Sequence, residues 1–122
     1  MPTWSYSVER GWLEGPDGGW AGHSGEDAGR NNPQAQNSCL VGPIPEGDYE
    51  VLPVEQGTPW GDWVVPLRRL ETGWPSFGRG GVVVHGPLDF HGQNPGHTCV
   101  VMPEEARRAL AQAAGAVIEV RK

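Results

Sequence analysis

Glycine and proline recur along this chain at short intervals, and that spacing limits what the chain can fold into. There are 19 glycines and 12 prolines among 122 residues. They form turn-like clusters with short apolar segments between them, and the clusters fall at 15–19, 22–33, 42–47, 57–61 and 73–81. Short strands separated by regularly spaced turns are typical of β-sandwiches and β-barrels. The chain therefore predicts a compact, mainly β fold of the sandwich or barrel type, in one domain that spans 1–122.

The segments between the turns are expected to be strands, at 4–8, 48–54, 63–70, 82–85, 98–102 and 116–120. One helix is expected in the C-terminal region, over about 103–114, because apolar residues recur there at helical spacing: Ala106, Ala109, Leu110, Ala113 and Ala114. Pro103 opens this helix and Gly115 closes it. A final strand is expected after Gly115.

Composition and charge exclude some classes of partner. The six tryptophans and the regular apolar segments argue for a packed fold rather than a disordered chain. The net charge is −6 and the basic residues are scattered, which argues against a nucleic-acid partner. Residues 1–15 lack the regions of a secretory signal, and no apolar run approaches the length of a membrane span. We expect a protein that is made in the cytoplasm without a Sec signal and has no membrane partner.

Cys99 is the candidate for covalent chemistry, because it lies shortly after a strand-like segment that ends in His85. A thiol is mostly protonated near neutral pH, so a nucleophilic cysteine needs an imidazole nearby to take its proton. His97 lies two residues before Cys99, on the same face if the segment is extended. His85 lies further back and would be returned by the loop 87–96. Both histidines are therefore candidate partners, and a cysteine that only packs in the core remains the alternative.

Several motifs stand in the order seen in one family: Trp4-Ser5-Tyr6-Ser7, Gly11-Trp12-Leu13, Gly22-His23-Ser24-Gly25, Asn31-Asn32-Pro33, Gly42-Pro43-Ile44-Pro45-Glu46-Gly47-Asp48-Tyr49, Phe77-Gly78-Arg79-Gly80 and Val84-His85-Gly86. In these motifs the chain resembles the type VI secretion L,D-transpeptidase effector domain family, whose active-site logic is similar to that of YkuD-type L,D-transpeptidases. The resemblance runs from about Trp4 to the last helix. It implies an L,D-transpeptidase-type fold.

The resemblance implies a catalytic set for this chain. Cys99 would be the nucleophile that forms an acyl-enzyme, and His85 would be the general base and acid. The carbonyl of Gly86 would orient the imidazole, and backbone N–H groups around Thr98 and Cys99 would bind the oxyanion. His97 stays in the catalytic set as the second candidate base. No cofactor and no metal are implied.

The resemblance also implies a substrate, the tetrapeptide stem of peptidoglycan. This peptide ends in D-alanine and carries a diaminopimelate carboxylate, so an arginine that grips planar anions is expected to contact it. Arg79 and Arg30 are the candidates, and His23 and Ser24 are expected to line the cleft. The activity implied is L,D-carboxypeptidase or D-amino-acid exchange, a hydrolase or transferase reaction of the bacterial cell wall.

Peptidoglycan lies outside the cytoplasm, so the implied activity needs a delivery route. The resemblance implies an antibacterial toxin that a secretion apparatus carries into the periplasm of a target cell. An immunity protein is then an expected partner, beside the peptidoglycan stem peptides.

The sequence leaves three alternatives open. Gly96 stands where the family usually has Ser or Thr, and Thr98 stands where the family usually has Gly. A β-branched residue such as threonine does not easily adopt φ > 0. A catalytically impaired module that only binds the cell wall is therefore one alternative. The second is a zinc-site protein, and the third is a disulfide from Cys39 to Cys99 that would silence the thiol. The zinc ligands would be His85, His91, His97 and Cys99.

Overall fold

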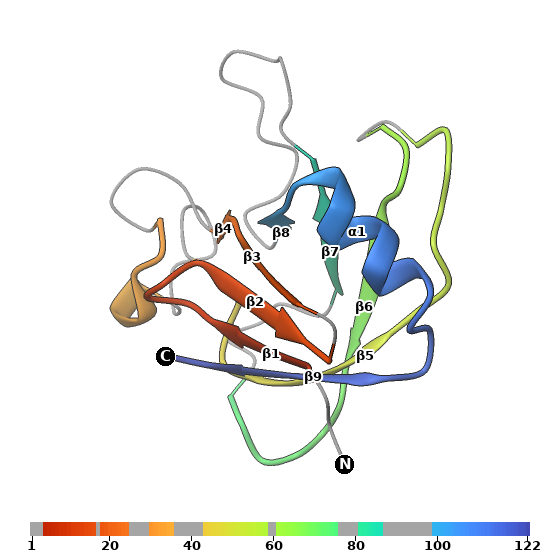
Figure 1. The fold of residues 1–122 in the computed structure, drawn as a ribbon. Helices are drawn as coiled ribbons and strands as arrows, with labels where there is room; N and C mark the ends of the chain where they lie inside the picture. The colour runs from red at the N-terminus through yellow and green to blue at the C-terminus, as the bar shows by residue number, and fades with distance from the viewer. Residues whose placement is uncertain are drawn as a thin grey trace.

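The computed structural model describes residues 4–16, 18–24, 30–35, 43–58, 61–75, 81–86 and 99–122. These residues form nine strands of one mixed sheet that curls into a nearly closed barrel (Figure 1). The strands are β1 (Trp4–Ser7), β2 (Trp12–Gly15), β3 (Gly18–Ala21), β4 (His23–Ser24), β5 (Gly47–Val51), β6 (Val65–Arg69), β7 (Gly81–His85), β8 (Cys99–Val101) and β9 (Val117–Arg121). The other elements are a short 3₁₀ turn, Pro33–Ala35, and one α-helix, α1 (Glu104–Ala111). The predicted mainly β fold with one helix and a final strand is confirmed.

Strand order in the sheet is β3-β2-β1-β9-β5-β6-β7-β8-β4, so neighbours in space are often distant in sequence. Two pairs, β1 with β9 and β7 with β8, are parallel, and the other pairs are antiparallel. A parallel pair requires a crossover between its strands. In the pair of β7 and β8, that crossover falls at 86–98, which includes the loop 87–96 expected to return His85 to Cys99.

The hairpin of β2 and β3, and the short strand β4, were not expected, because the clusters at 15–19 and 22–33 suggested only turns. Their glycines instead make room for tryptophan rings. A Cβ atom added to Gly19 would lie 2.5 Å from the ring of Trp12, and one added to Gly15 would lie 2.7 Å from the ring of Trp4. A glycine in a strand often marks such a close approach. The rings of Trp4 and Trp20 stack across the same part of the sheet, 6.2 Å apart.

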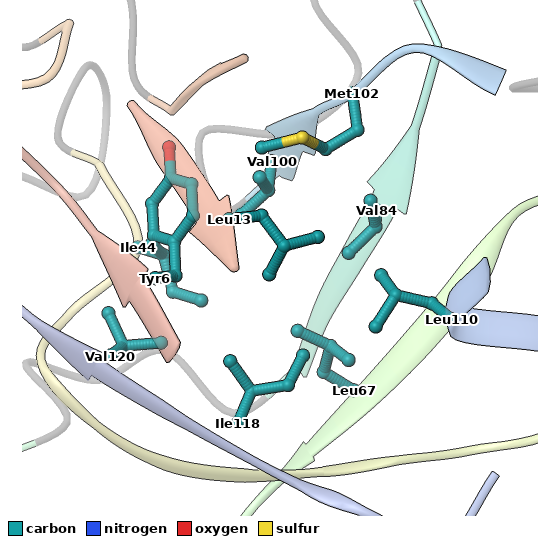
Figure 2. A pocket seen from close by; sticks show the side chains of 10 residues that line it. All are labelled: Tyr6, Leu13, Ile44, Leu67, Val84, Val100, Met102, Leu110, Ile118 and Val120. Carbon is teal, nitrogen blue, oxygen red and sulfur yellow. The ribbon is translucent and has the colours of Figure 1, made fainter. Parts of the chain in front are cut away.

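The barrel interior is closely packed and apolar. Figure 2 shows the side chains that surround a small cavity of about 10 Å³: Tyr6, Leu13, Ile44, Leu67, Val84, Val100, Met102, Leu110, Ile118 and Val120. A space of this size holds at most about one water molecule. The hydroxyl of Tyr6 is buried and has no hydrogen-bond partner among the described residues, and burial raises the pKa of this phenol.

The helix is shorter than predicted, and its buried face is the predicted one except at two positions. Pro103 is the N-cap residue and Gln112 is the C-cap residue. Leu110 is buried and points toward Val84 and Leu67 in Figure 2. Ala114, which was placed on the apolar face, is exposed, whereas Arg107 is buried. Among the described residues, no helix is long and apolar enough to cross a membrane.

Two neighbouring glycines of β3 provide a test of the packing against tryptophan. We expect Gly19→Ala to destabilise the fold by about 1–3 kcal/mol, because the new methyl group displaces the Trp12 ring. Gly18→Ala is the matched control, since its Cβ would meet its nearest atom at 3.6 Å, an ordinary contact. We expect the control to stay within about 0.5 kcal/mol of the wild type. Urea unfolding measures both, and equal losses would contradict this account of β3.

Candidate active site

Three strands at one end of the sheet carry the candidate site, with β8 lying between β7 and the edge strand β4. In the parallel pair Cys99 is in register with Val83 and Val101 with His85, while in the antiparallel pair Val101 is in register with His23. Residues in register on adjacent strands share a face, and so do residues two apart on one strand. Positions 85, 23 and 99 therefore lie on the same face of the sheet. The opposite face carries the core residues Val84 and Val100.

His85 has one ring nitrogen held in place and the other without a described partner. Nδ1 lies 2.7 Å from the carbonyl oxygen of Gly86, and the side chain is only 1% exposed. A carbonyl only accepts hydrogen bonds, so Nδ1 carries the proton of the neutral ring and Nε2 carries the lone pair. Nε2 is buried and has no hydrogen-bond partner among the described residues. This is the arrangement of a base that faces into the protein.

The surroundings of His85 favour the neutral ring. Burial lowers its pKa below the ordinary value of 6.5, and the positive charge of Arg107 lowers it further. The hydrogen bond to the Gly86 carbonyl acts in the opposite direction. Burial is the largest of these effects, so the net shift is downward. At neutral pH the imidazole is therefore uncharged and able to accept a proton at Nε2.

His23 lies on the other side of β8 and interacts electrostatically with His85. It is half-buried, and its pKa is lowered first by burial, then by Arg30 and then by His85. Arg30 is exposed. His23 thus lies on the side of β8 away from β7, and the charge of Arg30 acts on it. Both are candidate substrate contacts from the sequence.

Ser24 has a structural contact in the interior. Its hydroxyl is fully buried and accepts a hydrogen bond from the backbone N–H of Ile44, at 2.8 Å. Its backbone N–H donates to Oδ1 of Asn31 and its carbonyl accepts from the Asn31 N–H. These bonds hold the segments at 31 and 44 against β4. Ser24 therefore supports the strand that carries His23.

Arg107 is the residue that the sequence analysis missed. It comes from α1 and is only 9% exposed. Its guanidinium lies against Gly86, where an added Cβ would be 2.6 Å from Nη2. The only sequence signal is its place three residues before Leu110, on the buried side of the helix. Arginine side chains are mostly exposed in proteins, so an arginine in a helix is expected to face solvent. The sequence pattern therefore did not single out Arg107.

Several predicted site residues lie outside the described residues, namely Arg79, His97, Thr98, His91 and Cys39. The disulfide alternative, and two of the four ligands of the zinc alternative, therefore depend on residues that the structure does not describe. Within the described part of the chain, no three His, Cys, Asp or Glu residues gather where they could hold a metal ion.

The lowered pKa values of His85 and His23 make stability depend on pH. The unfolded chain binds more protons than the folded one once the pH falls below about 6.5, so the free energy of unfolding should decrease from pH 7.5 to pH 5.5. In His85→Asn this decrease should be smaller, because the amide can still donate to the Gly86 carbonyl but does not titrate. Urea unfolding at both pH values measures the difference. The same decrease in the variant and the wild type would contradict the lowered pKa.

Comparison with known proteins adds no family assignment to this geometry. The chain matches no model of a known protein family, and a search of curated proteins finds no relative. The functional argument therefore depends on the residues and contacts of the chain itself.

Proposed function

We propose that this chain is a peptidoglycan-modifying cysteine enzyme of the L,D-transpeptidase type, with Cys99 as nucleophile and His85 as general base and acid. One observation carries the proposal. His85 is a buried, neutral imidazole whose Nδ1 donates to the Gly86 carbonyl, and it lies on the strand that pairs with the strand that begins at Cys99. The sequence resemblance described above supplies the substrate class.

The buried position of Nε2 supports a thiol as the proton donor. A base that is 1% exposed does not take protons from bulk water, so its partner is a group of the protein or of a bound substrate. Position 99 lies on the same face of the sheet and on the adjacent strand. A nucleophile, a base within reach and a third group that orients the base make up the general pattern of covalent catalysis.

The reaction then follows in two steps. Nε2 of His85 takes the thiol proton, and the sulfur of Cys99 attacks the carbonyl between diaminopimelate and D-alanine. The tetrahedral intermediate collapses to a thioester as the peptide C–N bond breaks, and the imidazolium gives its proton to the departing amine of D-alanine. In the second step water attacks the thioester, His85 accepts its proton, and the thiol of Cys99 is regenerated. A D-amino acid in place of water gives exchange.

The positive charge of Arg30 and the neutral imidazole of His23 fit an anionic peptide. His23 lies on the side of β8 opposite β7, the charge of Arg30 acts on it, and stem peptides carry free carboxylates. These two residues, with Arg79, are the proposed substrate contacts, and Thr98 is proposed to contribute to the oxyanion site. Delivery to the periplasm of a target cell by a secretion apparatus, and inhibition by an immunity protein, belong to the same proposal.

The test is mass spectrometry of tetrapeptide muropeptides incubated with the reduced protein, with and without an added D-amino acid. We expect loss or exchange of D-alanine with the wild type. Cys99→Ala should abolish it, and Cys39→Ala, the same substitution at the other cysteine, should keep it. His85→Asn should slow turnover by about 10²–10⁴-fold, the usual contribution of a general base.

Other outcomes separate this proposal from its alternatives. No turnover by the folded, reduced wild type, together with retention on insoluble peptidoglycan, would reject the enzyme and indicate a binding module. Zinc that co-purifies with the protein and is lost in His85→Asn would indicate the metal site instead. Equal activity of Cys99→Ala and the wild type would reject Cys99 as the nucleophile.

A further inference from the structure

The guanidinium of Arg107 is held behind His85 by backbone carbonyls from two separate segments. Its Nε donates to the carbonyl of Met102 at 3.1 Å, and its Nη1 donates to the carbonyl of Asp62 at 2.7 Å. A longer contact, 3.4 Å, joins Nη1 to the carbonyl of Trp63. Met102 in turn donates its backbone N–H to the carbonyl of His85 at 2.9 Å. The guanidinium thus links α1, the turn at 62–63 and the end of β7.

The turn that receives Arg107 is itself fixed in place. Trp63 has a φ of 55°, which is a strained backbone conformation for a bulky side chain. Its N–H donates to Oε1 of Gln56 at 2.8 Å, and the guanidinium of Arg108 lies 4.4 Å from the centre of its ring. The turn therefore holds the carbonyl groups that accept hydrogen bonds from Arg107 in a defined position.

A buried guanidinium costs free energy that packing alone does not recover. Burial lowers the pKa of Arg107, and the hydrogen bonds described for it all go to uncharged carbonyls. Glu104 acts on it only through its field, since the Glu104 carboxylate is paired with Arg108 at 2.7 Å. An apolar side chain of similar volume would cost less at such a site. The charge and the flat fork of arginine therefore have a use here other than stability.

Gly86 connects this guanidinium to the base. The guanidinium lies where the side chain of residue 86 would be, beside the Gly86 peptide group. The carbonyl of that group is the acceptor for Nδ1 of His85. A small shift of the peptide would lengthen the 2.7 Å hydrogen bond and release the ring.

We propose that Arg107 is a positioning residue for His85: its buried guanidinium holds the Gly86 peptide, and that peptide keeps the imidazole in the form with Nδ1 protonated and Nε2 free. Its consequence for catalysis rests on the proposed function. The same guanidinium adds a positive charge that, with burial, favours the neutral ring. His23 on β4 also interacts with His85, and Arg30 acts on His23.

The test measures directly which ring nitrogen of His85 carries the proton. Nitrogen-15 NMR of histidine-labelled protein at pH 8, with His85 assigned through His85→Asn, reports which ring nitrogen is protonated. We expect the Nδ1–H form in the wild type and a shift toward the Nε2–H form, which free histidine prefers, in Arg107→Lys and in Gly86→Ala. Arg68→Lys is the matched control, the same substitution at an exposed arginine of β6 that is paired with Glu50, and it should keep the wild-type signals.

Two folded variants that both keep the Nδ1–H form would overturn the proposal. A wild-type measurement decides the matter if the variants do not fold: separate Nη signals from a non-rotating Arg107 guanidinium support the proposal, and averaged signals overturn it. With muropeptide substrate, Arg107→Lys should lower kcat by about 100-fold with a smaller change in KM, the cost of a misplaced catalytic group. Absence of turnover in the wild type would reject the proposed function alone, because the ring signals do not depend on substrate.

Discussion

The parallel pairing of β7 with β8 is the constraint on which the candidate site depends. Only three residue pairs define it, and it continues into the hydrogen bond from the Met102 N–H to the His85 carbonyl. This short ladder joins two segments that are separated by the whole stretch 86–98. Because a register slip of one residue would move every side chain of β8 to the other face, the pairing decides which residues can meet His85. Val84 and Val100, packed into the barrel on the opposite face, hold that register.

The strands of the barrel core could be predicted from the sequence because their apolar residues alternate or run together between turns. The hairpin of β2 and β3 could not be predicted, because a glycine in the sequence can indicate either a turn or a strand position that an aromatic ring approaches closely. In Gly15 and Gly19 the second meaning applies, and only the fold shows which ring comes close. The local sequence pattern does not show which glycine a tryptophan ring will approach.

The candidate base was predictable and its surroundings were not. His85 stands in a recognisable segment with Gly86, and the contact between them is local in sequence. The nearness of His23 depends on the pairing of β4 with β8, which is a property of the whole sheet. Arg107 escaped prediction for a different reason: its hydrogen bonds go to backbone carbonyls, which every residue has, so no particular side chain in the sequence marks its partners.

The surroundings of His85 act on the pKa of its imidazole in opposite directions. Burial and the charge of Arg107 favour the neutral ring, which the proposed reaction needs for its first proton transfer. The Gly86 carbonyl favours the imidazolium, which in the proposed reaction protonates the leaving amine. An imidazole whose pKa was only lowered would accept a proton poorly. An imidazole whose pKa was only raised would already be protonated. Arg107 lies against Gly86, so the charge that lowers the pKa of the ring sits beside the residue whose carbonyl raises it.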